Sequence, residues 1–249
     1  MEGSRILRNS QIIILGVCIA AATIISSVIL SQGFLKIMKF TREQITVTGS
    51  ATKEIKSDYI VWRSIFSRRE PDLAAAYAKL KDDLEKVKAY FAQKGVNEKE
   101  VIVLQVSTDT IYKKNEKGND TNDIQGYKLT QGIEIRSNDV DKIDSLSRES
   151  TELINQGVEF ESGAPEYFYQ KLDELKIEML GIATENAKAR AENMVKATGN
   201  KIGSIRSAKM GVFQITPITS TDVSDWGMND TSSLDKKVMS VVTASFSIE

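Results

Sequence analysis

The sequence has no histidine among its 249 residues. Without histidine the chain cannot carry a Ser-His-Asp or Cys-His catalytic arrangement, and it lacks the commonest ligand of catalytic zinc, copper and non-haem iron. Its only cysteine, Cys18, lies inside an apolar run, so the rest of the chain has neither a disulfide nor a thiolate. These absences favour a protein that is not an enzyme, and we expect no catalytic, cofactor-binding or metal-binding residues.

An excess of positive charge is also missing. The chain has 33 basic and 34 acidic residues, a net charge of −1. Four of the basic residues and one acidic residue lie in the N-terminal 40 residues, and without them the net charge is −4. A domain with that balance has no reason to bind nucleic acid. The basic cluster Ser67–Arg69 is expected to be a solvated strand end.

The N-terminal region contains a long run without charge, from Asn9 to Leu35. As a helix, residues 12–35 span about 36 Å, enough for a hydrocarbon core of ~30 Å. Ala20–Ala22 resembles a signal-peptide cleavage site, but the apolar run continues beyond it, which favours an uncleaved anchor. Whether this segment is cleaved stays open. Basic residues flank both ends and leave the orientation open as well: Arg5 and Arg8 before it, Lys36, Lys39 and Arg42 after it.

From Gln44 onward, strand patterns alternate with helical ones. "QITVTGSATKEI" alternates inward and outward residues, and Gly49 within it suggests a bulge or a close backbone approach. "YIVWRSIFSRR", from Tyr59, is a second strand, and we expect the two to form a hairpin.

An amphipathic helix is predicted between Pro71 and Gly95. Its inward positions are Leu73, Ala76, Tyr77, Leu80, Leu84, Val87 and Phe91, and its outward charges are Lys81, Asp82, Asp83, Glu85, Lys86 and Lys88. Strands from Val101 and from Tyr127 form the next antiparallel pair. The segment "KKNEKGNDTND" between them is expected to be a hairpin tip, because it lacks the periodic carboxylates of a calcium loop.

The next helix is predicted to be capped by Asn138 and to stop at Gly157, with Val140, Ile143, Leu146, Leu153 and Ile154 inward. The strand "VEFESG" follows it. The longest helix is expected over residues 171–198, with one continuous face formed by Leu172, Leu175, Met179, Ile182, Ala183, Ala187, Ala191, Met194 and Val195. The alanines recur every four residues, so a backbone can approach closely, and Arg190 beside them can reach a carboxylate or a carbonyl. We expect tight packing on a sheet here and no ligand cradle.

A strand over residues 205–216 and a final strand over residues 237–249 enclose a polar segment, residues 217–235. Structureless loops of this length tend to be functional or interaction elements. Trp226 near its middle either contacts a partner or folds back on the domain, and the sequence leaves these alternatives open.

The element order ββα-ββα-βα-ββ predicts an α+β fold, in which antiparallel sheets of hairpins pack with three helices after one N-terminal transmembrane helix. We expect residues 1–40 to be a tail and anchor and residues 41–249 to be one domain. This second region resembles the SIMPL domain family (DUF541), which includes bacterial periplasmic and outer-membrane immunogenic proteins. The resemblance rests on "ITVTGSATKEIKSD", "GYKLTQGIEI" followed by "VDKID", "INQGVEF" and "ATENAKARAENMVKATGNKIGSI".

The resemblance implies an extracytoplasmic domain, a homo-oligomer that is ring-like in some members, and an association with envelope and stress physiology. It also implies a cytoplasmic N-terminus and a C-terminal domain in the periplasm, held to the inner membrane by residues 12–35. The family supplies no catalytic residues to carry over. The leading hypothesis is therefore a non-enzymatic, membrane-anchored envelope protein that self-assembles.

Two other functions compete with this hypothesis. A binding module for a cell-wall fragment or a small ligand would use Trp226 or the aromatic cluster Tyr167, Phe168 and Tyr169 as a stacking platform, although core packing is favoured for the tyrosines. An enzyme could use paired carboxylates such as Asp222 and Asp225. Two aspartates in one polar loop are common, so this is the weakest alternative.

Overall fold

The computed structural model describes residues 3–249, apart from the side chains of residues 3–13 and 39–42. The chain divides into two compact units. Unit 1 comprises residues 1–51, 180–211 and 241–249, and unit 2 comprises residues 52–179 and 212–240. Each unit is therefore assembled from segments that are distant in the sequence.

Helix α1 (Gly3–Arg42) contains the predicted membrane segment. Ile14–Met38 is long and apolar enough to cross a membrane, and none of it is buried within the chain. A signal sequence near the N-terminus passes the same test of length and apolar composition. Cys18 on this helix is exposed. The predicted flanking charges of Arg5, Arg8, Lys39 and Arg42 lie outside the described side chains.

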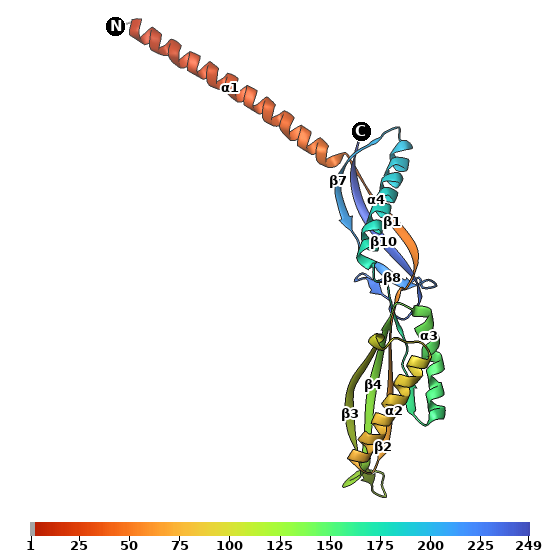
Figure 1. The fold of residues 1–249 in the computed structure, drawn as a ribbon. Helices are drawn as coiled ribbons and strands as arrows, with labels where there is room; N and C mark the ends of the chain where they lie inside the picture. The colour runs from red at the N-terminus through yellow and green to blue at the C-terminus, as the bar shows by residue number, and fades with distance from the viewer. Residues whose placement is uncertain (1–2) are drawn as a thin grey trace. The chain divides into compact units, whose positions relative to one another are not determined.

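In unit 1, helix α4 (Leu172–Lys196) packs on antiparallel strands (Figure 1). The neighbours of β10 (Asp235–Ile248) there are β1 (Gln44–Lys56) and β7 (Ile202–Met210). β10 pairs with β7 from Val242↔Met210 to Ile248↔Ile202. The apolar core of the unit is small. The elements that contribute to it are α4 (Leu172–Lys196), β1 (Gln44–Lys56), β7 (Ile202–Met210) and β10 (Asp235–Ile248), and its buried residues are Val47, Ala187, Ala191, Ala244 and Phe246.

Unit 2 is built on a second five-stranded sheet, with the order β3-β4-β2-β5 and with β6 also paired to β2. Helix α2 lies along one face of this sheet (Figure 1), and the buried side of β2, which includes Trp62 and Phe66, faces it. The strands are β2 (Tyr59–Glu70), β3 (Val101–Lys114), β4 (Asp120–Ser137), β5 (Glu159–Ser162) and β6 (Glu166–Phe168). The helices are α2 (Leu73–Gln93), α3 (Val140–Glu149) and the 3₁₀ turns η1 (Glu98–Glu100) and η2 (Ser150–Gln156).

Unit 2 also contains β8 (Gln214–Pro217), which pairs with Lys236–Met239 of β10, and the short β9 (Met228–Asn229), which pairs in parallel with β8. The predicted α+β class, the antiparallel pairing and the three helices after the N-terminal one are confirmed. The predicted strand over residues 205–216 is instead two strands, β7 and β8.

The predicted hairpin of the first two strands is wrong. β1 is a neighbour of β10 and β2 pairs with β4, so the two strands belong to different sheets. Short connections usually join paired strands, and the two residues between β1 and β2 carry no signal for a change of sheet.

Several side chains also differ from their predicted positions. The second helix is capped by Asp139 instead of Asn138, since the Asp139 carboxylate accepts the backbone N–H of Lys142. Asp83, predicted to face outward, is buried. Five residues predicted to face inward are exposed: Leu73, Tyr77, Ile154, Ile182 and Met194.

Candidate functional site

The alanine face of α4 is a packing surface. Ala183, Ala187 and Ala191 are fully buried, as predicted. A Cβ atom built on Gly49 would lie 2.2 Å from the carbonyl oxygen of Ala183 and 2.3 Å from the amide nitrogen of Ala187. Strand and helix backbones therefore touch at this point, and there is no space for a ligand between them.

Two polar side chains of α4 bind the backbone of β1 beside this contact. Asn186 Oδ1 accepts the backbone N–H of Ser50 at 3.1 Å, and Arg190 Nη1 donates to the carbonyl oxygen of Thr48 at 3.0 Å. Alternate residues of a strand point their backbone groups to the same side, so both contacts fall on one edge of β1. Arg190 thus binds a carbonyl, one of the two partners expected from the sequence, and helps α4 to cover a sheet edge.

The aromatic cluster does not form a stacking platform. Tyr167 is buried in the core of unit 2, and its hydroxyl donates to Asp144 Oδ1 at 2.6 Å. Burial and this hydrogen bond raise the pKa of Tyr167 to about 12. Phe168 and Tyr169 are half-buried. The predicted core role of Tyr167 is confirmed.

The segment of residues 217–235, here called the tryptophan loop, is ordered at its base. Buried Gln214 of β8 holds Ser224, since its Nε2 donates to the Ser224 carbonyl oxygen at 2.6 Å. At the other end, Lys236 is 3% exposed, and its Nζ donates to the carbonyl oxygens of Asp230 and Tyr167 at 2.5 and 2.6 Å. Burial lowers the pKa of Lys236. These two anchors had no signal in the sequence, because a lone glutamine or lysine in a strand usually faces solvent.

The indole of Trp226 lies in solvent although the loop around it is ordered. Its side chain is 94% exposed, and nearby Val223 is 68% exposed. The loop therefore folds back onto β8 through β9, while its tryptophan does not. The exposed indole on a loop with a hydrogen-bonded base makes this segment the candidate interaction surface.

The tryptophan loop also carries the two carboxylates that the enzyme alternative would use. Asp222 and Asp225 are both exposed, and Asp222 Oδ2 accepts the hydroxyl of Ser220 at 2.9 Å. Within the described residues, there is no group of three or more histidine, cysteine, aspartate or glutamate side chains that could hold a metal ion.

The tip between β3 and β4 is a hairpin turn, as predicted, in which Asn115 Oδ1 accepts the backbone N–H groups of Lys117 and Asn119.

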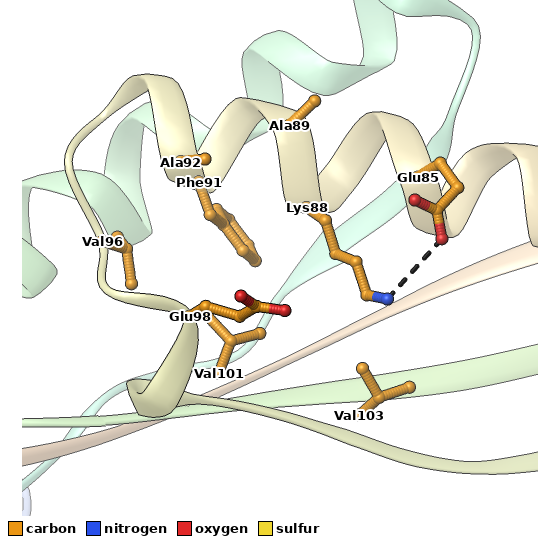
Figure 2. A pocket seen from close by; sticks show the side chains of 9 residues that line it. All are labelled: Glu85, Lys88, Ala89, Phe91, Ala92, Val96, Glu98, Val101 and Val103. Carbon is orange, nitrogen blue, oxygen red and sulfur yellow. Dashed lines mark ion pairs between the residues drawn. The ribbon is translucent and has the colours of Figure 1, made fainter.

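A pocket of about 540 Å³ lies between α2 and β3 (Figure 2). Six of its nine lining residues are apolar and three are charged, and two of the charged residues, Lys88 and Glu85, form an ion pair at 3.6 Å. The lining residues are Glu85, Lys88, Ala89, Phe91, Ala92, Val96, Glu98, Val101 and Val103. No local pattern in the sequence predicts this pocket, because its lining residues come from separate elements that only the fold brings together.

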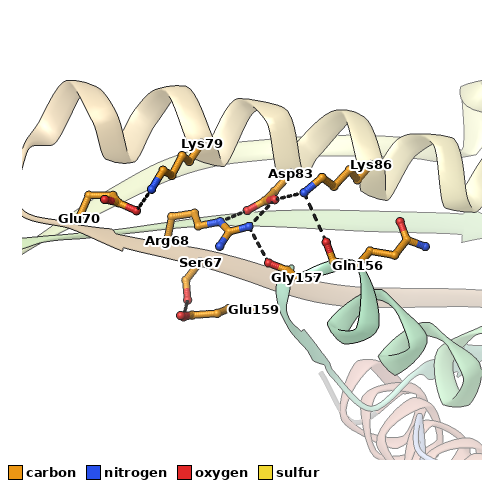
Figure 3. A network of polar contacts seen from close by, with 9 residues as sticks. All are labelled: Ser67, Arg68, Glu70, Lys79, Asp83, Lys86, Gln156, Gly157 and Glu159. Carbon is orange, nitrogen blue, oxygen red and sulfur yellow. Dashed lines mark hydrogen bonds and ion pairs between the residues drawn. The ribbon is translucent and has the colours of Figure 1, made fainter.

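A buried ionic cluster joins α2 to β2 and to the turn after η2 (Figure 3). Asp83 is 1% exposed and receives two hydrogen bonds from Arg68, one of them from Nη2 at 2.8 Å. Arg68 also donates to the carbonyl oxygen of Gly157 at 2.6 Å, and Lys86 lies 3.3 Å from Asp83. Asp83 raises the pKa of Arg68, chiefly through the hydrogen bond.

The cluster corrects two predictions from the sequence. Asp83 does not face outward, and Arg68 within Ser67–Arg69 is not a solvated strand end. Asp83 lies three residues after Leu80 and four before Val87, both buried, and this spacing on the apolar stripe was the available signal.

The fold and these surfaces define an α+β protein with one candidate membrane span and an exposed tryptophan loop. A model of the SIMPL family, described as proteins of unknown function (DUF541), matches residues 45–246. The chain belongs to this family. No curated protein matches it.

Among solved structures, an amidase of the hydantoinase/carbamoylase family from Burkholderia phymatum is similar over 52% of this chain, with 12% sequence identity and a TM-score of 0.27. The matched region is 34% of the amidase chain. Similarity at this level carries no argument about function.

Proposed function

We propose that the protein is a non-enzymatic, membrane-anchored protein of the cell envelope whose C-terminal region lies outside the cytoplasm and assembles into a homo-oligomer. Membership of the SIMPL family and the candidate span Ile14–Met38 support the anchor and the envelope location. In this proposal α1 crosses the inner membrane once with its N-terminus inside, and the protein acts in envelope and stress physiology.

The observation that carries the assembly is the exposure of Trp226. In a monomer, 94% of this side chain is in water, next to the exposed Val223. The hydrogen bonds at the base of the loop reduce the backbone entropy that is lost when a second copy covers the indole. Buried aromatic side chains are typical anchors of protein–protein interfaces.

The test measures the mass of the full chain in detergent or lipid nanodiscs by light scattering. A mass of several copies supports the proposal, and a single copy at all concentrations overturns it. Orientation is tested separately with a reporter fused after Glu249. A reporter that works only outside the cytoplasm is expected to be active, and activity of a cytoplasmic reporter contradicts the topology.

A second candidate function rests on the same tryptophan. An exposed indole on an ordered loop can stack on a sugar ring of a cell-wall fragment. Trp226 and Trp62 are the two tryptophans, and Trp62 is fully buried, so quenching by added ligand reports on Trp226. Quenching of a monomer by cell-wall fragments favours the binding module, whereas an emission shift with protein concentration alone favours assembly.

A further inference from the structure

The pocket between α2 and β3 is a feature of unit 2 alone. All of its lining residues lie between Glu85 and Val103, in the second half of α2, in η1 and the turn before it, and at the start of β3. β3 is the last strand of its sheet, and Val103 on it is 38% exposed. The volume of about 540 Å³ falls within the range of small-ligand sites, roughly 300–1,000 Å³.

The apolar part of the pocket is a preformed surface. Phe91 and Val96 are buried, and the Phe91 ring contacts Trp62 edge-on, with 5.6 Å between the ring centroids. The core of the unit therefore holds this part of the lining in place. Ala89 and Ala92 are small and exposed on α2, and a larger side chain at either position would fill the space. An apolar group that enters the pocket leaves water for a surface that is already formed.

The charges that line the pocket do not cancel. Lys88 and Glu85 form an ion pair, whereas Glu98 takes part in no ion pair among the described residues. Glu98 and Lys88 both reach into the space between α2 and β3 (Figure 2). Lys99 follows Glu98 in the chain but is not a lining residue. The lining thus has two carboxylates and one ammonium group, and one carboxylate is left without a partner.

The Glu98 side chain is not needed to hold the turn in which it lies. In the capping box of η1, Asn97 Oδ1 accepts the backbone N–H of Lys99, and Glu100 Oε2 accepts the backbone N–H of Asn97. Glu100 Oε1 also accepts the hydroxyl of Ser137 at 2.6 Å. Glu98 is exposed, and its charge is available to a ligand.

We infer that this pocket binds a small amphiphilic cation, whose apolar body lies against Phe91 and Val103 and whose ammonium group lies beside Glu98. The unpartnered carboxylate selects the sign of the ligand's charge, because it attracts a cation and repels an anion. A neutral apolar ligand gains from the pocket but not from Glu98. The site is independent of the proposed assembly, since none of its lining residues belongs to the tryptophan loop.

The first experiment compares three probes that share one ring and differ in charge at neutral pH: benzylamine, benzyl alcohol and benzoate. Each carries a fluorine atom on the ring, so that broadening of its fluorine NMR signal reports binding directly. The full chain is held in phosphatidylcholine nanodiscs, whose headgroups have no net charge, and empty nanodiscs give the background. An ion pair at an exposed site changes affinity modestly, so benzylamine is expected to bind about threefold more tightly than benzyl alcohol, and benzoate most weakly. Equal affinities, tightest binding of benzoate, or no binding of any probe overturns the inference.

The second experiment removes the selecting charge. Glu98→Gln keeps the size of the side chain and is expected to lower the affinity for benzylamine by about threefold, to that of benzyl alcohol. The affinity for benzyl alcohol is expected to stay unchanged. Glu116→Gln, at an exposed glutamate of the β3–β4 tip, is the matched control and is expected to change neither. A preference for benzylamine that survives Glu98→Gln contradicts the inference.

The third experiment fills the pocket. Ala92→Phe places a ring in the space and is expected to weaken the binding of benzylamine and benzyl alcohol alike, by about tenfold or more. Position 92 is exposed, so the chain is expected to stay folded, which circular dichroism checks. Ala78→Phe, at an exposed position of α2 outside the pocket, is the control for the added ring and is expected to leave binding unchanged. Binding that persists in folded Ala92→Phe contradicts the inference.

The two proposals fail in different ways. A chain that assembles outside the cytoplasm but has no preference for benzylamine contradicts this inference alone. A monomeric chain that binds benzylamine through Glu98 contradicts the proposed assembly and supports this inference.

Discussion

Gly49 of β1 lies directly against Ala187 of α4, so closely that a Cβ atom at position 49 would stand 2.3 Å from the Ala187 amide nitrogen and 2.7 Å from its Cα. Each residue permits the other, since a larger side chain at either position would force the strand and the helix apart. The contact lies beside the Asn186 and Arg190 hydrogen bonds that cover the edge of β1. The alanine-rich helix therefore acts through packing and edge protection.

Replacement of Ala187 by leucine tests this contact. The side chain of Ala187 is fully buried against β1. Extra methyl and methylene groups there overpack the interface, and we expect the free energy of unfolding to fall by ~1–3 kcal/mol. Chemical denaturation followed by circular dichroism measures the change.

Ala189→Leu is the control, because Ala189 lies two residues further along the same helix and is exposed. Leucine and alanine are both good helix formers, so this change is expected to leave stability within about 0.5 kcal/mol. Equal effects of the two substitutions would mean that the alanine face does not pack as described.

Asp83 is the second test position, because it holds a buried charge. Its removal by Asp83→Ala leaves the partly buried guanidinium of Arg68 without its carboxylate partner (Figure 3). Loss of one member of a buried ion pair typically costs ~3–5 kcal/mol. A decrease of that size in the free energy of unfolding is expected.

Asp82→Ala provides the comparison, since Asp82 is the exposed neighbour and should change stability by less than about 0.5 kcal/mol. The double variant Asp83→Leu/Arg68→Leu removes both charges. Its cost in unfolding free energy should be smaller than the sum of the costs of Asp83→Leu and Arg68→Leu measured separately. Additive costs would show that the two side chains do not stabilise each other.

Local patterns in the sequence predicted much of the packing but not which strands pair. The alternation around Gly49 concerns one strand and the four-residue repeat of alanines concerns one helix, and both predictions are confirmed. The separation of β1 and β2 into two sheets depends on β10 and β4, which lie far along the chain. Pairing between distant strands leaves no trace in a local pattern.

The candidate surface was predicted only in part. The length of the tryptophan loop and the presence of Trp226 indicate an interaction element. The position of the loop depends on Gln214 and Lys236, which lie outside residues 217–235 and hold its base through hydrogen bonds. The open edge of β3 beside the pocket likewise follows from strand order. A sequence shows that a strand exists, but not which of its edges is covered.

Tyr167 predicts a dependence of stability on alkaline pH. Burial and the hydrogen bond to Asp144 raise its pKa from 10.0 to about 12, so the unfolded chain releases this proton first as the pH rises. Between pH 10 and 12 ionisation therefore favours unfolding, and the free energy of unfolding should fall by roughly 2–3 kcal/mol from this residue alone.

Tyr167→Phe isolates this effect, because phenylalanine has no proton to lose. The variant is expected to be less stable at pH 8 by about 1 kcal/mol through the lost hydrogen bond, but to depend less steeply on pH above 10. Parallel curves for the native chain and the variant would contradict the raised pKa.

Trp226→Ala tests the tryptophan loop itself. The side chain is 94% exposed, so its removal should leave the unfolding free energy of a single copy unchanged. If a second copy covers the indole, truncation costs the assembly about 2 kcal/mol or more and shifts the full chain in nanodiscs towards smaller particles. Light scattering and denaturation of the same sample separate the two effects.

Tyr77→Ala is the control, because Tyr77 is an exposed aromatic residue outside the loop, and it should change neither the particle mass nor the stability. A loss of stability with the particle mass unchanged would show that Trp226 packs within its own chain. If mass and stability both remain unchanged, the tryptophan is free of subunit contacts, and quenching by cell-wall fragments then decides whether it binds a ligand.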